Sequence, residues 1–279
     1  HLSGTLISGL TKLESLIYFN IEHNKFSGDL HGRFNFSIQP NLQSLVLGAN
    51  KFTGTLPRDL FRPGLITFSA YDNCLENYVP KAICNAKTLK TLVLDGMQTS
   101  PYCKKGSSSF LSAYKQRNSD ALVCLISKMP RIRVLHLSSL ALRGNVLESV
   151  ESVGKYLDHM SLSYNQLIGT IPVAIQKKRW RSLDLSFNFF TGELVEDFNS
   201  VMIDPGDDDA TDDDGDDDVI NYIPNDDYYR FNASIAYASD VFLDINHLSG
   251  QVPSTLLGNG YNRKDLQVSI LDGNLFSCN

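Results

Sequence analysis

Twelve aspartates stand within residues 204–227, a stretch of this 279-residue sequence that contains no Lys or Arg. Carboxylate oxygens are the ligands that Ca²⁺ prefers in proteins, so the run could hold this ion. The nine residues that would do so are Asp207, Asp208, Asp209, Asp212, Asp213, Asp214, Asp216, Asp217 and Asp218. An EF-hand pattern is matched only in part, because its first and twelfth ligand positions would be Ala210 and Asn221. Calcium binding is therefore one interpretation of this acidic run.

Two other interpretations of the acidic run stay open. The default is a solvated linker, because like charges repel and few apolar side chains are present to be buried. Alternatively, the run docks on a basic patch, which Lys177, Lys178, Arg179 and Arg181 provide around Trp180. Since the whole chain has a net charge of −6, the residues outside the run carry +6. Our hypothesis is an electrostatic clasp within or between chains, which calcium could assist.

Five cysteines could form disulfides, and their spacings match neither a zinc ribbon nor a C-x-x-C redox motif. Cys74 and Cys84 lie on two arms of one expected turn, and Cys103 and Cys124 flank an expected insertion. We therefore predict the pairs Cys74–Cys84 and Cys103–Cys124, with Cys278 unpaired. The second bridge would stabilise the fold by roughly 3 kcal/mol through loop-closure entropy. Disulfides would indicate a secreted protein, and the alternative is five reduced thiols in a core.

Motifs for catalysis are missing from the sequence. It has no nucleophile elbow, no H-E-x-x-H, no P-loop and no G-x-G-x-x-G. The six histidines are scattered, and only His136 and His159 could be lateral neighbours, with Asp158 and Asp184 nearby. A polar surface for a partner explains this group better than a metal or general-base site. We predict no enzymatic activity and no cofactor apart from calcium, and the net charge also disfavours nucleic-acid binding.

A sequence motif that recurs along the chain, called the phrase below, indicates the elements that position these residues. It closes on Asn, and apolar residues usually stand eight, five and three positions earlier. The closing residues are Asn24, Asn50, Asn73, Asn165, Asn188, Asn246 and Asn274. After the Asn, the motif usually has an apolar residue at position plus two, a Gly at plus four and another apolar residue at plus six. One such set is Leu167, Gly169 and Ile171, followed by Pro172. Recurrence every 23 to 28 residues indicates a solenoid.

The phrase also predicts local structure. Its L-x-x-L-x-L stretch alternates, which favours a short strand with one face inward. The Asn can satisfy backbone groups of the following turn, and Gly and Pro suit the bend of the return segment. Stacked units bury a continuous core and pair their strands in a parallel sheet. Nine units are legible, with a partial one in residues 1–6.

The phrase resembles the leucine-rich repeat family, specifically its plant-type class with the consensus L-x-x-L-x-L-x-x-N-x-L-x-G-x-I-P. The resemblance covers most of the chain outside two insertions. It implies an α/β-type solenoid of about nine to ten repeats, with a parallel β-sheet on the concave face. It also implies a non-enzymatic interaction scaffold, often part of a receptor, without naming the ligand. We accordingly expect a single solenoid domain over residues 1–279.

The repeat is interrupted twice. Residues 98–129 form the first insertion, and Met97 and Leu140 replace Asn in the units on either side. We predict a disulfide-stapled side loop that leaves the stack in register. The second interruption separates Asn188 from Asn246, and we assign residues 199–237 to an inserted acidic loop.

Side chains between the core positions of each strand should point to the concave face, where we expect a partner to bind. Exposed aromatic residues beside carboxylates are a common interface composition. The predicted ligand face consists of Tyr71, Asp72, Asp95, His136, Tyr164, Asp184, Phe187 and Phe242.

Two functions remain open. One is an extracellular receptor or adhesion domain that binds a protein, peptide or glycan. The other is a structural subunit of a cell-surface or matrix assembly, with copies in contact through insertions, glycans and the acidic loop. N-glycosylation sequons at Asn35 and Asn232 agree with the secretory pathway. No apolar run approaches membrane-spanning length. Because the chain begins inside a repeat, we also expect it to be a piece of a longer protein.

Overall fold

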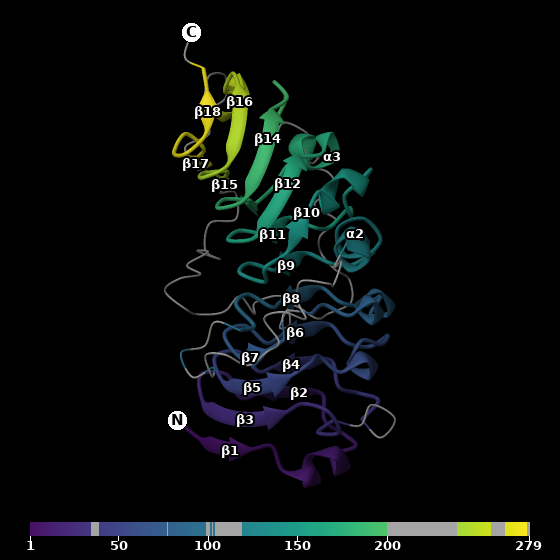
Figure 1. Ribbon diagram of the computed structural model, residues 1–279. Coiled ribbons are helices and arrows are strands. Elements are labelled where there is room, and N and C mark those ends of the chain that lie inside the picture. Colours follow the sequence, from purple (N-terminus) through teal and green to yellow (C-terminus); the bar gives the residue numbers. More distant parts are fainter. Residues whose placement is uncertain are drawn as a thin grey trace.

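The computed structural model describes residues 1–34, 39–76, 78–98, 101, 103, 119–199, 239–257 and 266–277. These residues form an elongated stack of repeated units (Figure 1). Nine strands make one parallel sheet along the concave face: β2 (Tyr18–Asn20), β4 (Ser44–Val46), β6 (Thr67–Ser69), β8 (Thr91–Val93), β9 (Val134–His136), β11 (His159–Ser161), β13 (Ser182–Asp184), β15 (Ser239–Phe242) and β17 (Leu266–Ser269). Neighbours in this sheet are consecutive units of the sequence, which confirms the predicted fold class.

An outer layer of strands follows the turn of each unit and forms two parallel sheets. The first contains β1 (Ser3–Thr5), β3 (Lys25–Asp29), β5 (Lys51–Gly54) and β7 (Cys74–Leu75). The second contains β10 (Arg143–Gly144), β12 (Gln166–Thr170), β14 (Phe189–Glu193), β16 (His247–Gly250) and β18 (Leu275–Phe276).

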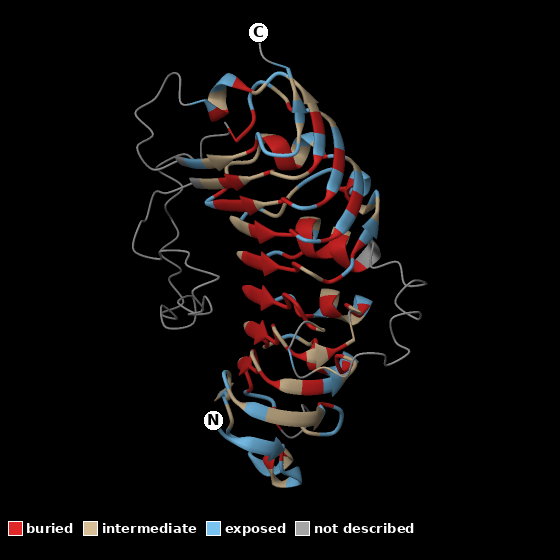
Figure 2. Ribbon diagram, turned by 60° about the vertical axis from the view of Figure 1, so that its left-hand side comes forward, coloured by how far each residue is buried: buried red, intermediate tan, exposed pale blue. Residues whose placement is uncertain are grey.

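Short helices complete the return segments. They are the 3₁₀ turns η1 (Ser8–Lys12), η2 (Arg58–Leu60), η3 (Lys81–Asn85), η5 (Val146–Ser149) and η7 (Ser254–Leu256), and the α-helices α2 (Ser119–Ser127) and α3 (Val173–Lys177). One apolar core runs from Leu6 to Ile270 between the strands and these helices. Figure 2 shows the buried residues along the middle of the stack.

Each Asn of the repeat joins two units. The Asn188 Nδ2 donates to the Leu185 carbonyl (3.2 Å) and the Ser186 carbonyl (3.1 Å) of its own turn. It also donates to Leu162 O of the preceding unit at 3.0 Å, while its Oδ1 accepts from Leu167 N at 3.1 Å. The same pattern of bonds surrounds Asn50, Asn73, Asn165 and Asn246. This ladder satisfies backbone groups that would otherwise be buried without partners.

In the part of the chain that the structure describes, the outer layer is interrupted where the ladder is interrupted. Met97 and Leu140 replace Asn, and β7 and β10 end the two outer sheets at this place. In an intact unit, the Asn side chain accepts a backbone N–H near the start of the outer strand of the preceding unit, as Asn188 does from Leu167. An apolar side chain cannot accept this hydrogen bond. The concave sheet nevertheless continues directly from β8 to β9, with Val93 opposite His136. The predicted register is therefore confirmed, and Met97 and Leu140 both lie in the main core.

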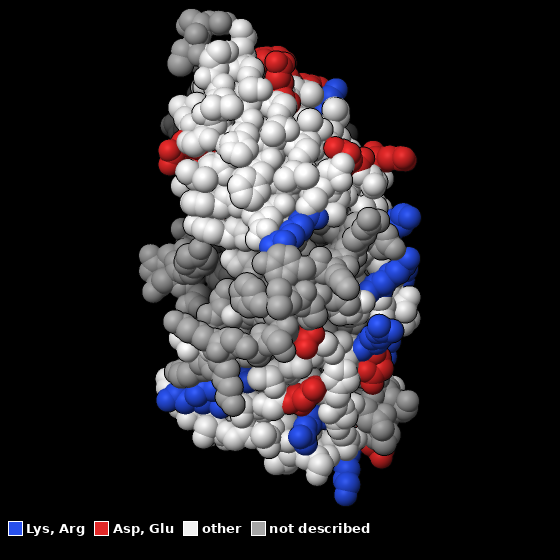
Figure 3. All heavy atoms as spheres, in the orientation of Figure 1, with Lys and Arg blue, Asp and Glu red and all other residues white. Residues whose placement is uncertain are grey.

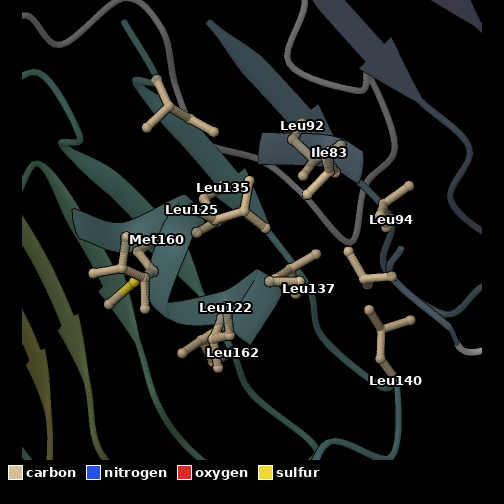
Figure 4. Close-up of a cluster of buried hydrophobic side chains, with 14 of the residues drawn as sticks. Ile83, Leu92, Leu94, Leu122, Leu125, Leu135, Leu137, Leu140, Met160 and Leu162 are labelled. Atoms are coloured by element: carbon tan, nitrogen blue, oxygen red, sulfur yellow. The ribbon is translucent and has the colours of Figure 1, made fainter. Parts of the chain in front are cut away.

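The predicted extent of the first insertion was wrong. Residues 119–127 form helix α2, whose Leu122 and Leu125 are buried among strand residues such as Leu135 (Figure 4). The helix packs between η3 and η5, in the position of a return segment. Its apolar residues supply core that the unit of Leu140 needs, so this segment belongs to the repeat.

The predicted disulfide pairs, Cys74–Cys84 and Cys103–Cys124, were also wrong. The structure joins Cys74 to Cys103 and Cys84 to Cys124, with Cα atoms 5.2 and 6.1 Å apart. Cys84 in η3 faces Cys124 in α2 because these helices are packed neighbours in the stack. Both bridges lie where the outer layer is interrupted. Cys278 lies outside the described residues.

Replacing Asn188 with Ala should lower the free energy of unfolding by about 3 kcal/mol, because several buried backbone groups lose their partner. Denaturant unfolding followed by circular dichroism would measure the loss. The matched control is Asn145→Ala: the Asn145 side chain is exposed and bonds to Glu148, so a change of about 0.5 kcal/mol or less is expected. Equal losses in the two variants would contradict the role of the ladder.

Digestion of the unreduced protein followed by mass spectrometry should recover peptides linked through Cys74–Cys103 and Cys84–Cys124. Each bridge closes a loop of tens of residues, so its loss should destabilise the fold by about 3 to 4 kcal/mol. Recovery of a Cys74–Cys84 peptide would show that the arrangement described above is incorrect.

Candidate functional site

The eight residues predicted for the ligand face fall into two groups. Tyr71, Asp95 and His136, in the N-terminal and middle units, are 1 %, 2 % and 1 % exposed. Tyr164 and Phe187, in the C-terminal units, are 46 % and 39 % exposed. The expectation that all of them form one exposed surface was therefore wrong.

Tyr71 is buried by packing along the face. Its ring lies over Gly48 of the preceding unit, where an added Cβ would come within 2.1 Å of Tyr71 Cε1. The ring forms a small apolar cluster with Val93 and Val134. Its hydroxyl lies 3.1 Å from His23 Nε2. Tyr71 thus connects several units.

Asp95 and His136 form a buried pair across β8 and β9. The His136 Nδ1 lies 3.4 Å from Asp95 Oδ2, and the other carboxylate oxygen accepts the backbone N–H of Ser138 at 2.5 Å. This pair occupies the strand junction beside the interruption of the outer layer. Asp72 is half-buried in the turn before Asn73, where it lines a shallow hollow of about 180 Å³ with His23.

The two exposed aromatic residues form a stack. The rings of Tyr164 and Phe187 lie 4.1 Å apart at an interplanar angle of 11°. Each occupies the last position before the Asn of its unit, at the end of the concave strands, with φ of 53°. Ile245 follows in the next unit with φ of 50°. This left-handed conformation costs about 1 to 2 kcal/mol for a residue with a Cβ, and bulky or β-branched residues seldom adopt it.

Asp184 and Phe242 lie beside the stack on neighbouring strands, directly opposite each other in register. The Asp184 Oδ1 accepts from the Ser186 backbone N–H at 3.0 Å and from its hydroxyl at 2.6 Å. These bonds orient the carboxylate on the face. The ring of Phe242 is half-buried.

Two further carboxylates belong to this region and were not selected from the sequence. Asp240 lies in β15 in register with Ser182 and His159. Burial raises the pKa of Asp240, and the nearby His159 partly offsets the rise. Asp244 follows two residues after Phe242; its Oδ1 is shielded from solvent and accepts no hydrogen bond from the described residues. The signal that could have identified them is their position six and two residues before Asn246.

We call this surface the acid–aromatic rim and define it by Tyr164, Phe187, Phe242, Asp184, Asp240 and Asp244. A cation can be held by a carboxylate and by the face of an aromatic ring together. The rim therefore suits a basic side chain from a partner. Among the described residues, no group of three or more His, Cys, Asp or Glu side chains could hold a metal ion.

A family model described as Leucine Rich Repeat matches residues 179–201, the unit that contains Phe187. The match agrees with the Asn ladder and with the stacked parallel sheets. The chain has the leucine-rich repeat fold. None of the curated proteins matches this leucine-rich repeat chain.

Solved structures with the same fold include plant receptor kinases. The Arabidopsis receptor kinase HAESA, in complex with the peptide hormone IDA and the co-receptor SERK1, has a TM-score of 0.60 and 20% identity, covering 99% of this chain and 37% of its own. The PEPR1–AtPEP1 structure has a TM-score of 0.62 and 20% identity, and the match covers 99% of this chain and 31% of the PEPR1–AtPEP1 chain. GASSHO1/SCHENGEN3 from Arabidopsis thaliana has a TM-score of 0.55 and 19% identity, and the match covers 98% of this chain and 29% of the receptor chain. This leucine-rich repeat chain thus spans about a third of the length of these receptor structures.

Several predicted sites lie outside the described residues. They are the sequon residues Asn35 and Asn232 and the nine aspartates of the acidic run. Calcium binding and the electrostatic clasp therefore stay predictions. None of the described helices has the length and hydropathy needed to cross a membrane.

Asp240→Asn should raise the thermal midpoint at pH 7. Because the folded pKa of Asp240 lies above its ordinary value of 3.8, ionisation favours the unfolded state as pH rises through and beyond that value. Asn removes this penalty, so the gain should be largest at neutral pH and should shrink as pH falls towards 4. Asp272→Asn, at an exposed position, is the control. A gain that does not depend on pH would contradict the explanation.

Proposed function

We propose that this protein is an extracellular, non-enzymatic recognition scaffold that binds a protein or peptide on the acid–aromatic rim. The observation that carries the proposal is the exposed stack of Tyr164 and Phe187 beside the oriented carboxylate of Asp184. Exposed aromatic residues with few rotatable bonds are typical centres of binding energy in interfaces.

The geometry favours an extended partner. Neighbouring strands of a sheet are about 4.8 Å apart, so the four units of β11, β13, β15 and β17 present a face about 14 Å long. An extended peptide of four or five residues spans a similar length. A basic side chain could contact Asp184 or Asp244 while an apolar part of the peptide packs on Phe187 or Phe242.

Two further observations support this function. The disulfides Cys74–Cys103 and Cys84–Cys124 favour an oxidising compartment, as expected of a secreted or cell-surface protein. Structures of the same fold include receptors solved with peptide hormones, such as HAESA with IDA. From these structures we take only the proposal that the ligand is a peptide or protein, because the similarity lies in the fold and does not identify a particular ligand.

The test begins with selection of ligands from a library of displayed random peptides on the immobilised protein. We expect enriched peptides to contain basic and apolar residues, and Phe187→Asn to weaken their binding at least tenfold in calorimetry. Asn tolerates the left-handed conformation at position 187, so the thermal midpoint should stay equal or rise. That combination separates a binding role from a structural one.

Phe189→Asn provides the matched control. Phe189 is also an exposed Phe, but it lies in outer strand β14, with its ring beside that of His247 and outside the Tyr164–Phe187 stack. Its replacement should change peptide affinity less than twofold. Equal losses in the two variants, or no enriched peptide, would refute binding at the rim. Rim-dependent self-association in light scattering, without peptide binding, would favour the structural-assembly function instead.

A further inference from the structure

The stack brings basic residues from distant parts of the sequence onto one edge of the concave sheet. Backbone hydrogen bonds join Arg133 N to Lys90 O (2.8 Å), Asp158 N to Arg133 O (3.1 Å) and Arg181 N to Asp158 O (3.0 Å). These residues occupy the same position, just before the concave strand, in four consecutive units. A column that runs from residue 90 to residue 181 is thus contiguous in space.

Lysines of the preceding return segments continue this edge. The Lys178 Nζ donates to the Lys155 carbonyl of the unit before it at 3.1 Å. The Lys87 Nζ lies 3.5 Å from the Lys128 carbonyl. We define the basic ridge by Lys87, Lys128, Arg133, Lys155, Lys178 and Arg181. Figure 3 shows Lys and Arg side chains along one edge of the molecule.

Few negative charges offset the ridge within the described residues. The backbone ladder places two carboxylates here: Asp158, which pairs with Arg181 at 3.3 Å and with His159 at 2.8 Å, and Asp240, whose backbone N–H donates to Arg181 O at 2.9 Å. Lys87, Lys128, Lys155 and Arg181 are exposed to solvent. A row of like charges of this kind attracts a polyanion and releases its counterions on binding.

An aromatic ring lies within the ridge. Tyr156 is 42 % exposed, with Lys155 Nζ 5.4 Å and the Arg133 guanidinium 5.9 Å from the ring centroid. The cations at its borders keep the ring in place. Such a ring offers an apolar surface to the C–H face of a sugar between two positive charges.

We propose that the basic ridge binds an extended acidic polysaccharide, with carboxylate or sulfate groups on the Lys and Arg side chains and a sugar ring on Tyr156. The ridge covers four units, about 14 Å at the spacing of parallel strands, which suits a linear polymer. The disulfides place the chain in an oxidising compartment, which favours an acidic glycan over a nucleic acid. The ridge precedes the concave strands, whereas the stacked pair of the rim follows them, and the two surfaces meet only at Asp240, whose N–H donates to Arg181 O.

The experiment compares two triple variants of the full chain. Lys87→Gln/Lys128→Gln/Lys155→Gln removes three ridge charges, and Lys12→Gln/Lys25→Gln/Lys51→Gln removes three charges from N-terminal units. Calorimetry with polygalacturonate and with heparin, at several salt concentrations, gives the affinities. Circular dichroism checks that each variant is folded.

We expect wild type to bind at least one of the two polysaccharides, and the ridge variant to bind it at least tenfold more weakly. The slope of log Kd against log salt should fall in magnitude by about two to three in the ridge variant. The control variant should change affinity less than twofold. Tyr156→Ala should weaken binding several-fold without changing the salt slope, because the ring carries no charge.

Three results would overturn the proposal. The first is no binding of either polysaccharide at about 0.1 M salt. The second is an equal loss in the two triple variants, which would indicate general charge attraction. The third is evidence that the ridge binds another partner. That evidence would be tighter binding of a single-stranded nucleic acid of matched charge, or ridge-dependent self-association without polysaccharide binding.

Discussion

The hydrogen bonds of the Asn side chain hold the layers of this solenoid together. In a unit such as that of Asn188, one amide donates to carbonyls of two turns and accepts the N–H that opens the outer strand of the preceding unit. Apolar burial alone stacks the units, but it does not set their register. The directional bonds of the Asn set it in the turns and the outer layer, whereas backbone pairing keeps the concave strands in register even between the units of Met97 and Leu140. The positions of all other side chains along the stack follow from this register.

At Met97 and Leu140, where the Asn is missing, the concave sheet and the outer layer behave differently. The concave sheet passes through it, since β8 and β9 still pair strand to strand. Within the described residues, the outer layer has no strand between β7 and β10. Helix α2 and two disulfides occupy this region, so covalent bonds and apolar packing replace the polar ladder where it is lost.

A strict register also places functional groups. The last position before each Asn lies beyond the end of a concave strand, which brings Tyr164 and Phe187 into contact although they are distant in sequence. The position before the strand aligns Arg133, Asp158 and Arg181 at the opposite edge. The stacked pair and the ridge thus lie at two borders of one sheet, and the two proposed partners would contact different ends of its strands.

The sequence could predict whatever depends on one unit and its immediate repetition. The Asn phrase predicts the strands, the turns, the parallel pairing and the passage of the concave sheet across the first interruption. Properties that depend on contacts between units were predicted less well. The burial of Tyr71 depends on the space that Gly48 leaves in the unit before it. The pairing of Cys84 with Cys124 depends on the position of α2, which was interpreted as an insertion. Of the ridge, the sequence analysis identified only Lys178 and Arg181, because residues such as Lys87 and Lys155 come onto one edge only after stacking.

The strained turns of the C-terminal units argue most directly for a binding function. Two residues in the left-handed region, Tyr164 and Phe187, together cost about 2 to 4 kcal/mol relative to Gly or Asn. Their mutual stacking returns about 0.5 to 1.5 kcal/mol, which does not offset that cost. Ile245 adds a third unfavourable conformation in the next unit, with φ of 50°. Stability alone would therefore favour small residues at all three positions. A large apolar side chain at each is explained if a partner covers the rim, because burial of a ring in an interface contributes about 2 kcal/mol or more.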